Sequence, residues 1–525
     1  MVTHVFFQPL KFLAQRKSMR ELQASQDCSI QRCDGARPIC RSCRSKPEQY
    51  GDCEYTDSGF TATQILEEKI GLLEARLEEL QRAEPTSSLV LHNPYSTPAG
   101  SAGPSNLEDA SSSLRHELLQ VFMSHASVVG LFLEKDRFLT AASRNQLSPS
   151  LVHVINLWGA TLSTHTRYDE EPLLYQAVQS ISLALSNPER QGDAYTHRIM
   201  ETIQAEHLLS QYFFYKGRVL EGNLHMITAI SLVVSTRMHQ IGSPSMAGLR
   251  SSLLEPPKDA VEEGERVHAF WAVLALNNCW TSIIGSTSNF DCTTNEGNRV
   301  DTPWPMDMEL YTQEGYRHPP SSRTVLNFAE GVPDSGTSLR SLYAKAALTF
   351  EHATTVGSKH IHHVRNQGDV RRTARCFDLM DGVTLRLTSE LYLLSGSFRG
   401  KDAQLYLTII VLAHAATMQL HKHFTDIYRT SREKVVTSVK QVMVALRSLD
   451  PSSFRFVDPI MAPLSSMSYQ LTIAEVDRLR SGSHSSEVLQ EMLQLAEGLL
   501  NIMTPLASSS PLFATHLAHM RSLNV

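Results

Sequence analysis

Four cysteines in the N-terminal part of the chain have the spacing of a metal site: Cys33, Cys40, Cys43 and Cys53. Their pattern is C-x6-C-x2-C-x9-C, and two thiolates in C-x2-C spacing can reach one zinc ion at about 2.3 Å. Together the four could form one tetrahedral four-sulfur zinc site, in which Cys28 could replace one ligand. Free thiols are the alternative. A disulfide framework fits less well, because nothing ahead of the cysteines looks like a secretory signal.

Residues 33–43, with the sequence CDGARPICRSC, and the Cys-Glu-Tyr of residues 53–55 resemble half of a known module. They are similar to the second half of the DNA-binding module of the fungal binuclear zinc-cluster transcription factors. In that family six cysteines hold two zinc ions, so the resemblance implies zinc as a cofactor and DNA as a partner. It also implies basic side chains that contact DNA, for which the candidates are Arg32, Arg37, Arg41, Arg44 and Lys46.

The first half of that module has no counterpart in this sequence. The family's opening C-x2-C pair would fall at Gln23 and Gln26, and Cys28 has the wrong C-x4-C spacing to the next cysteine. Only Arg32 is basic in the six positions where the family has its basic run. Either the segment ahead of the CDG motif is not its native partner, through an alternative start or a wrongly joined exon, or the protein has lost its DNA-reading half. The abrupt change at Arg32 favours the first interpretation.

Composition and charge limit the kinds of partner that the chain can have. The 525 residues carry a net charge of −6, so any binding of nucleic acid must be local. Residues 1–55 hold nine basic and six acidic side chains, which is weak support for a basic module. The longest apolar run, Leu405 to Ala416, is too short to span a bilayer and predicts a buried helix. We therefore expect a soluble, intracellular protein without a membrane partner, and the family resemblance implies that it is nuclear.

A dimerisation helix is expected over residues 61–83. Thr61 and Gln64 fit a capping box at its start. Apolar residues then recur at the a and d positions of a short parallel coiled coil, namely Leu66, Ile70, Leu73, Leu77 and Leu80. This seam predicts a homodimer, although fewer than three heptads need support from elsewhere. The alternative is a single amphipathic helix that packs on the body of its own chain.

The rest of the chain divides by composition into a linker and a helical body. Residues 84–113 are rich in Ser, Pro and Gly, which predicts a disordered linker. Beyond it the apolar spacing is helical, so the fold class is mainly α with little sheet. Gly217 should separate two helices, Met200–Lys216 and Val219–His239, into a hairpin. The predicted segments are residues 1–27 (a disordered segment unlike the family), 28–57 (partial zinc-cluster module), 61–83 (coiled coil), 84–113 (linker), 114–310 (helical regulatory domain), 311–338 (loop) and 339–525 (C-terminal helical region).

The segment 114–310 resembles the all-helical regulatory region of the same fungal factors. Four motifs occur in order: VINLWG at residues 154–159, the hairpin at 213–222, GERVHAFW at 264–271 and VDTPWP at 300–305. In the family this region modulates activity, and in some members it binds a small inducer. The resemblance therefore implies a small-molecule inducer as a further partner.

No motif indicates an enzyme, because the phosphate-binding, nucleophile-elbow and zinc-protease patterns are absent from the sequence. Three histidine groups could supply metal ligands, but such groups are expected among 22 histidines. They are His360, His362 and His363; His414, His421 and His423; and His516 and His519. The acidic residues Glu262, Glu263 and Glu265 are expected to be solvated in the first turn of an apolar helix, where they suit the helix dipole.

The sequence thus predicts a zinc-dependent, DNA-binding transcription factor that regulates RNA polymerase II transcription in a fungus. The alternative is a truncated form that does not bind DNA and acts as a dimerising interaction protein or a dominant-negative regulator. An upstream reading frame that encodes a C-x2-C pair followed by Arg and Lys would favour the first hypothesis.

Overall fold

A computed structural model of the chain describes most of the region from residue 104 onward. The described residues are 104–163, 168–184, 192–243, 253–290, 299–316, 321–366, 368–448, 455–481 and 486–523. All of them belong to one compact unit, Gly103–Val525. The N-terminal segment 1–27, the zinc-cluster module at 28–57, the helix at 61–83 and residues 84–103 of the linker lie outside the described residues and stay predictions.

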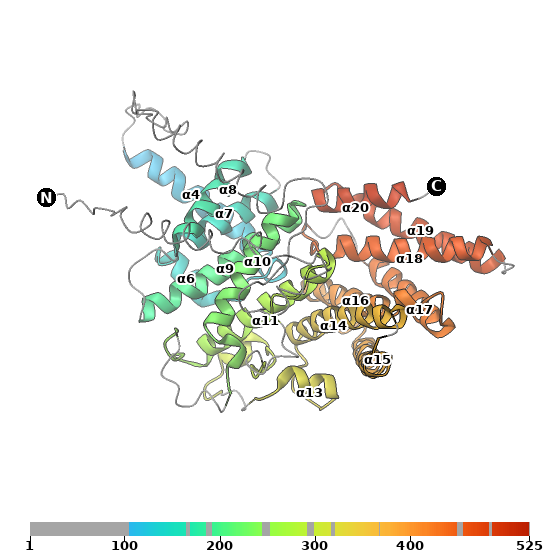
Figure 1. Cartoon of the computed structure of the whole chain (residues 1–525). Coiled ribbons are helices and arrows are strands. Elements are labelled where there is room, and N and C mark those ends of the chain that lie inside the picture. The colour runs from blue at the N-terminus through green and yellow to red at the C-terminus, as the bar shows by residue number, and fades with distance from the viewer. Residues whose placement is uncertain are drawn as a thin grey trace, which may run out of the picture. The chain divides into compact units, whose positions relative to one another are not determined.

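The described residues form α-helices and two short 3-10 helices and include no strand, which confirms the mainly α class. The first part of the unit lies on the left in Figure 1, from blue to green. Its helices are α4 (Pro104–Met123), α5 (Ala126–Val129), α6 (Lys135–Ser143), α7 (Pro149–Leu162), α8 (Glu170–Ala184), α9 (Asp193–Tyr215), α10 (Val219–Ser235) and α11 (Ala260–Ile284).

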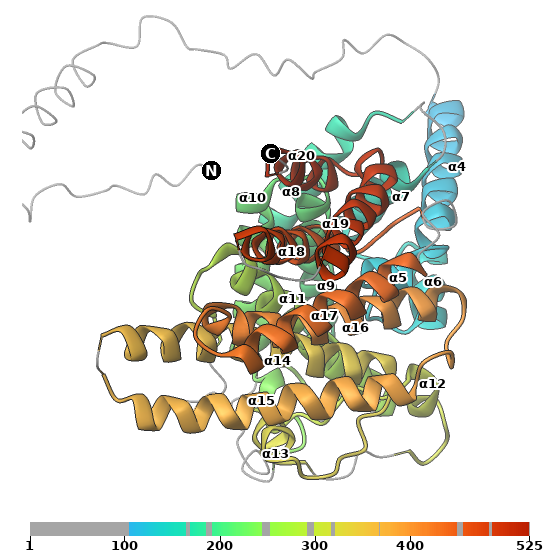
Figure 2. The same cartoon turned by 90° about the vertical axis from the view of Figure 1, so that its right-hand side faces the viewer.

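The second part of the unit lies on the right in Figure 1 and joins the first where α14 packs on α11. Its helices are α14 (Leu339–Arg365), α15 (Val370–Leu393), α16 (Gly400–His421), α17 (Arg429–Arg447), α18 (Met461–Ser481), α19 (Ser486–Ala507) and α20 (Pro511–Ser522). Two short helices, α12 (Met308–Tyr311) and α13 (Thr324–Glu330), lie between the two parts in sequence. In Figure 2, α15 lies beneath α14, on which it packs.

Local sequence signals explain where several helices begin and end. The side chain of Asp259 accepts from the backbone N–H of Glu262 at the start of α11, and Ser338 caps α14 in the same way. Such caps satisfy backbone donors that the first helical turn leaves without partners. Gly217 separates α9 from α10 with a φ of +75°, which confirms the predicted hairpin. A residue with a Cβ would be strained in that conformation.

The predicted linker ends earlier than the sequence indicated. Helix α4 begins at Pro104, so residues 104–113 are helical and the prediction of disorder was wrong for them. The reason is that extending an existing helix costs no new nucleation, so a segment with few large apolar side chains can join it. Further along α4, Leu118 and Phe122 are fully buried against the body, and they secure the helix to which this segment is attached.

The segment 311–338, predicted as a loop, contains the last residue of α12 and the whole of α13. Lys345 of α14 forms an ion pair of 2.8 Å with Asp334 of this segment. The hydroxyl of Ser338 donates to the carbonyl of Pro305. These contacts attach the connection to both parts of the unit.

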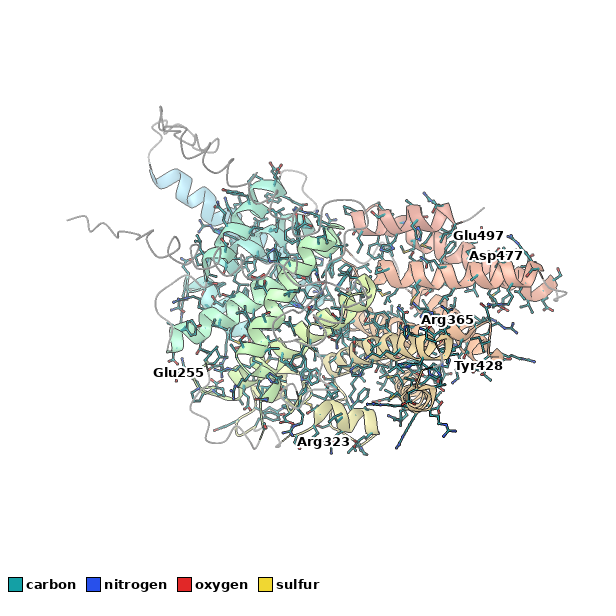
Figure 3. The ribbon with its side chains drawn as sticks, viewed as in Figure 1. Glu255, Arg323, Arg365, Tyr428, Asp477 and Glu497 are labelled. Atoms are coloured by element: carbon teal, nitrogen blue, oxygen red, sulfur yellow. The ribbon has the colours of Figure 1, made fainter. Side chains whose placement is uncertain are left out.

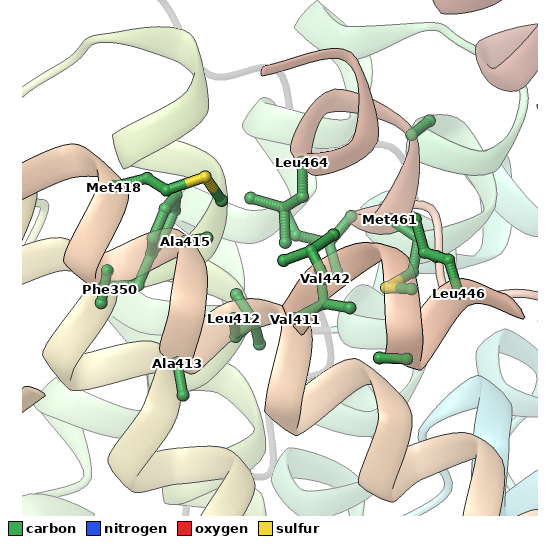
Figure 4. Close-up of a cluster of buried hydrophobic side chains, with 14 of the residues drawn as sticks. Phe350, Val411, Leu412, Ala413, Ala415, Met418, Val442, Leu446, Met461 and Leu464 are labelled. Atoms are coloured by element: carbon green, nitrogen blue, oxygen red, sulfur yellow. The ribbon is translucent and has the colours of Figure 1, made fainter. Parts of the chain in front are cut away.

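The central core surrounds α16. Side chains from α14, α16, α17 and α18 interlock there, and Figure 4 labels ten of them: Phe350, Val411, Leu412, Ala413, Ala415, Met418, Val442, Leu446, Met461 and Leu464. The buried helix predicted at Leu405–Ala416 is thereby confirmed. Two described helices, Ala260–Ile284 and Gly400–Phe424, are long and apolar enough to cross a membrane. However, 78% and 72% of their apolar windows are buried within the unit, as in core helices.

Charged and polar side chains are exposed at the periphery. Six exposed side chains from different elements are labelled at the edge of the unit in Figure 3: Glu255, Arg323, Arg365, Tyr428, Asp477 and Glu497.

A second core lies among the N-terminal helices and contains the VINLWG motif. Trp158 of α7 is fully buried and donates from Nε1 to the carbonyl of Leu208, at 2.9 Å. Its ring meets those of Tyr212 and Phe456 edge to face, with centroids 5.9 and 5.5 Å away. Gly159 follows at the point where α7 touches α4, and an added Cβ there would lie 2.8 Å from the Cβ of Leu118.

Candidate ligand pocket

The site residues predicted from the sequence lie outside the described residues, so their roles stay predictions. They are Cys28, Cys33, Cys40, Cys43 and Cys53 for metal, Arg32, Arg37, Arg41, Arg44 and Lys46 for DNA, and Leu66, Ile70, Leu73, Leu77 and Leu80 for dimerisation. Two further cysteines are described. Cys279 is buried, Cys376 is exposed, and both are free thiols.

The histidine groups noted in the sequence occupy structural positions. His360 Nδ1 lies 2.9 Å from Thr373 Oγ1, and His519 Nε2 lies 3.1 Å from Gln470 Nε2. Burial lowers the pKa of His414 to about 4, so this side chain is neutral at physiological pH. Among the residues that the structure describes, no group of three or more His, Cys, Asp or Glu side chains could hold a metal ion.

The acidic run at the start of α11 is not solvated as expected. Glu262 is buried and forms an ion pair of 2.6 Å with buried Arg266, one turn later. Glu265 accepts a hydrogen bond of 2.8 Å from the backbone N–H of Glu134, and burial raises its pKa to about 7. The expectation was wrong for these two residues because Glu262 pairs with a buried cation on its own helix, and Glu265 meets the backbone just ahead of α6.

A small internal cavity with polar walls lies where the two parts of the unit meet. It has a volume of about 60 Å³, which is room for about four water molecules at roughly 10–15 Å³ each. Its walls come from α5, α9, α11, α14, α16 and the segment ahead of α18. Trp271, Ala272 and Leu276 of α11 supply an apolar wall. Most of the polar groups come from α9 and α14.

Helix α9 contributes two buried polar side chains without a protein partner. His207 and Gln211 lie four residues apart, and therefore on one face of the helix. They are 3% and 6% exposed, and neither His207 Nδ1 nor Gln211 Oε1 has a hydrogen-bond partner among the described residues. Leaving such a group unsatisfied typically costs about 1–3 kcal/mol. Burial lowers the pKa of His207 to about 3, so its ring is neutral.

Gly130, at the end of α5, makes room for the His207 ring. Its φ is +110°, and a Cβ at this position would lie 2.6 Å from His207 Nε2. Both the backbone conformation and the close approach therefore require glycine here. Gln204, one turn before His207, has both of its amide atoms satisfied by this loop. Its Oε1 accepts from the N–H of Phe132 at 2.8 Å, and its Nε2 donates to the carbonyl of Gly130 at 3.1 Å.

Helix α14 contributes a cation to the cavity. Arg340 lies in its first turn and donates from Nη2 to the carbonyl of Leu131, at 3.3 Å. Among the described residues no carboxylate forms an ion pair with this guanidinium; Asp307, Asp402 and Glu309 act on it only at longer range. Burial lowers the pKa of Arg340 from its usual value, but arginine stays protonated in proteins. The cavity therefore has a positive charge with unused donor capacity.

An anion lies elsewhere on the wall. Asp458, ahead of α18, accepts from the N–H of Ile460 at 3.0 Å and from the hydroxyl of Tyr343 at 3.4 Å. Burial raises the pKa of Asp458 to about 6, so the carboxylate is mostly ionised at pH 7. Tyr343 follows Arg340 by three residues on α14, which places the two about one helical turn apart. The cavity thus offers a cation and an anion that are not paired with each other.

A surface groove of about 600 Å³ lies beside the cavity and shares Ser127, His268 and Arg340 with it. His268 is held by a hydrogen bond between its Nε2 and the carbonyl of Met306, at 2.7 Å. Arg340 therefore lines both spaces. The arrangement suits the binding of a small polar molecule.

Comparison with known proteins identifies the segment that contains much of this pocket. Residues 119–319 match the family model of the fungal specific transcription factor domain. This segment is a fungal specific transcription factor domain. The match confirms the resemblance to fungal transcription factors, and the domain is one of transcription regulators rather than enzymes. No curated protein and no solved structure matches the chain.

The fungal transcription factor domain supplies only one side of the pocket. Its residues include His207 and Gln211, whereas Arg340, Tyr343 and Asp458 lie beyond residue 319. The pocket therefore forms only when the domain packs against the C-terminal helices. A ligand in it would contact both parts of the unit at once.

Sequence reasoning missed the pocket, although one signal was present. Gln204, His207 and Gln211 recur at intervals of three and four residues along α9, so they form a polar stripe on one face of a helix that is buried over most of its length. Such a stripe on a buried helix indicates either internal hydrogen bonds or a polar cavity. The structure shows the first for Gln204 and the second for His207 and Gln211.

Proposed function

We propose that the chain is a nuclear regulator of RNA polymerase II transcription in a fungus, which reaches DNA through a zinc-dependent module at residues 28–57. The fungal specific transcription factor domain at 119–319 is the observation that carries this proposal. The CDG segment and the heptad both precede this domain, in the order that such regulators have. They support the assignment of DNA binding, zinc dependence and dimerisation. The heptad at 61–83 would join two copies of the chain.

The donor chemistry of the N-terminal cysteines fits one zinc ion. Cys33, Cys40, Cys43 and Cys53 supply four sulfurs, the number that a structural tetrahedral site takes. Zinc stabilises a small module that has too few apolar residues for a core of its own. The basic residues between the cysteines would then contact phosphates, which supply most of the affinity for DNA.

A second candidate function has a specific observation in its favour. Gln23 and Gln26 stand where the family has two further zinc ligands, and Arg32 is the single cation in the expected basic run. Base readout of guanine typically uses Arg or Lys, so the chain with this sequence has little means of reading a DNA site. In this alternative the chain dimerises and acts as an interaction protein or a dominant-negative partner.

Zinc content and DNA binding of the purified full chain test the two candidates. We expect about one zinc ion per chain by elemental analysis, and weak DNA binding without sequence preference in a selection from random duplexes. A variant with Gln23→Cys and Gln26→Cys and an Arg/Lys-rich run over residues 27–32 should bind two zinc ions. It should also bind DNA in a salt-sensitive and sequence-dependent way.

The outcomes separate the candidates. Tight specific binding by the unmodified chain would contradict the interaction-protein alternative. Failure of the restored variant to select any sequence, with two zinc ions bound, would contradict the DNA-binding proposal. A Cys40→Ser form of the restored variant is the control, because it should lose both the metal and the binding.

A further inference from the structure

We propose that the internal cavity beneath Arg340 is a binding site for a small zwitterion, with the 2-amino acids as the chemical class. A regulatory role for this site rests on the proposed function. The binding of a 2-amino acid to the chain does not. The inference is carried by the buried polar atoms of His207 and Gln211, which line the cavity without protein partners. It is also carried by two charged side chains, Arg340 and Asp458, which both line the cavity and form no ion pair with each other.

The groups on the wall specify what a ligand must present. Arg340 is only a donor and takes a carboxylate in a two-pronged hydrogen bond. Asp458 is only an acceptor when ionised, and Gln211 Oε1 is an acceptor, so both take an N–H donor. A molecule with a carboxylate at one end and an ammonium group at the other satisfies all three groups. A carboxylate alone would leave Gln211 Oε1 without a donor.

The size of the space limits the part of the ligand that enters. About 60 Å³ holds the amino and carboxylate groups of a 2-amino acid but no large side chain. A side chain would instead extend toward the neighbouring groove of about 600 Å³, which shares the lining residues Ser127, His268 and Arg340 with the cavity. The cavity would therefore recognise the common part of the class, and the groove would select among its members.

Water could fill the cavity in place of an amino acid. Variants of two glutamines on α9 distinguish a ligand site from a water-filled cavity. Gln211→Leu removes an unpartnered acceptor, whereas Gln204→Leu removes an amide that satisfies Phe132 N–H and the Gly130 carbonyl. If Gln211 serves a ligand, its replacement by a similar apolar shape raises the melting temperature of the unliganded chain. Gln204→Leu should lower it. A structural role in a water network predicts a lower melting temperature for both variants.

The test is calorimetric titration of the purified full chain with glycine, alanine, acetate and methylammonium, in buffer without DNA. We expect glycine and alanine to bind in the millimolar range or tighter, and acetate and methylammonium at least about tenfold more weakly, because each offers one charge only. Arg340→Gln should weaken glycine binding by about tenfold or more. Arg365→Gln, on the exposed end of the same helix, should leave it unchanged.

Results of three kinds would overturn the proposal. The first is that none of the four probes binds the wild-type chain. The second is that acetate binds as tightly as glycine, which would make the site a simple anion site. The third is that glycine binds equally to wild type and Gln211→Leu, or that Gln211→Leu melts below wild type. Because the titrations contain no DNA, they are unaffected if the chain proves not to bind DNA.

Discussion

Replacing Gly159 by alanine tests whether the glycine of the VINLWG motif is required for the close contact between α7 and α4. Gly159 lies in α7 where this helix crosses α4, and an added Cβ would overlap the carbonyl oxygen of Leu118 and lie 2.8 Å from its Cβ. These obstacles include backbone, which cannot rotate away as a flexible side-chain end can. The two helices must therefore move apart, and Leu118 and Phe122 on α4 would lose part of their burial.

The magnitude follows from two opposed effects. Overpacking typically costs about 1–3 kcal/mol, and a backbone obstacle places this site at the upper end. Alanine in place of glycine in a helix recovers about 1 kcal/mol. The net destabilisation is therefore about 2 kcal/mol, and it falls on the α4–α7 contact. At about 1.4 kcal/mol per factor of ten, the α4 amides should exchange hydrogen about 30-fold faster if α4 opens as a local unit.

Gly382→Ala is the matched control. Gly382 is also inside a helix, α15, but an added Cβ would meet only the end of the flexible Arg386 side chain, at 3.7 Å. This variant should be more stable than wild type by about 0.5–1 kcal/mol, with exchange in α4 unchanged. The measurement is hydrogen–deuterium exchange of the full chain, resolved to peptides over residues 114–123. Unchanged exchange there in Gly159→Ala would refute the assignment of Gly159 as a close-contact residue.

Two further changes probe an ion pair and the predicted dimer. His421 and Lys434 both hydrogen-bond Asp381 and lower the pKa of its carboxyl to about 2. Because this folded pKa lies below the usual 3.8, Asp381→Asn should cost at most about 2 kcal/mol above pH 4. In urea unfolding at a series of pH values this difference should shrink as the pH falls from 4 toward 2; a constant gap would contradict the ion-pair account. Replacing Leu73 and Leu77 by Asp should make the chain monomeric in sedimentation equilibrium, because a charge in the seam cannot be buried unpaired. The melting of the 103–525 unit should not change, and a double mutant that stays dimeric would place the dimer contact elsewhere.

The helical part of the fold was predictable because it depends on local spacing. The α9–α10 hairpin followed from apolar residues at helical intervals on both sides of Gly217, and the position needs a φ of +75° that glycine adopts readily. The buried helix around Leu405–Ala416 followed from its unbroken apolar run. In both cases a few neighbouring residues determine the outcome, so no knowledge of distant contacts is needed.

Predictions that depended on distant contacts were the ones that failed. Glu265 looks like a solvated residue near the start of a helix, but it is buried and accepts a hydrogen bond from the N–H of Glu134, 131 residues away in the sequence. Residues 104–113 look like linker, but they continue a helix that is secured further along by Leu118. The composition of a segment indicates how polar it is. It does not indicate the surface on which the segment packs, and that surface decided the outcome in these cases.

The pocket shows the same limit and explains why it matters for function. His207 and Gln211 belong to the fungal transcription factor domain, while Arg340 and Asp458 lie beyond it, more than 120 residues later in the sequence. No spacing pattern connects such residues, because only the packing of α14 against α11 brings them together. The same packing means that a molecule held by Arg340 on one side and Gln211 on the other stabilises the contact between the domain and the C-terminal helices. A ligand that binds only the joined arrangement must favour it, by an amount that its concentration and affinity determine. A site assembled from both parts can thus report the presence of a small molecule to the whole unit, which neither part could do alone.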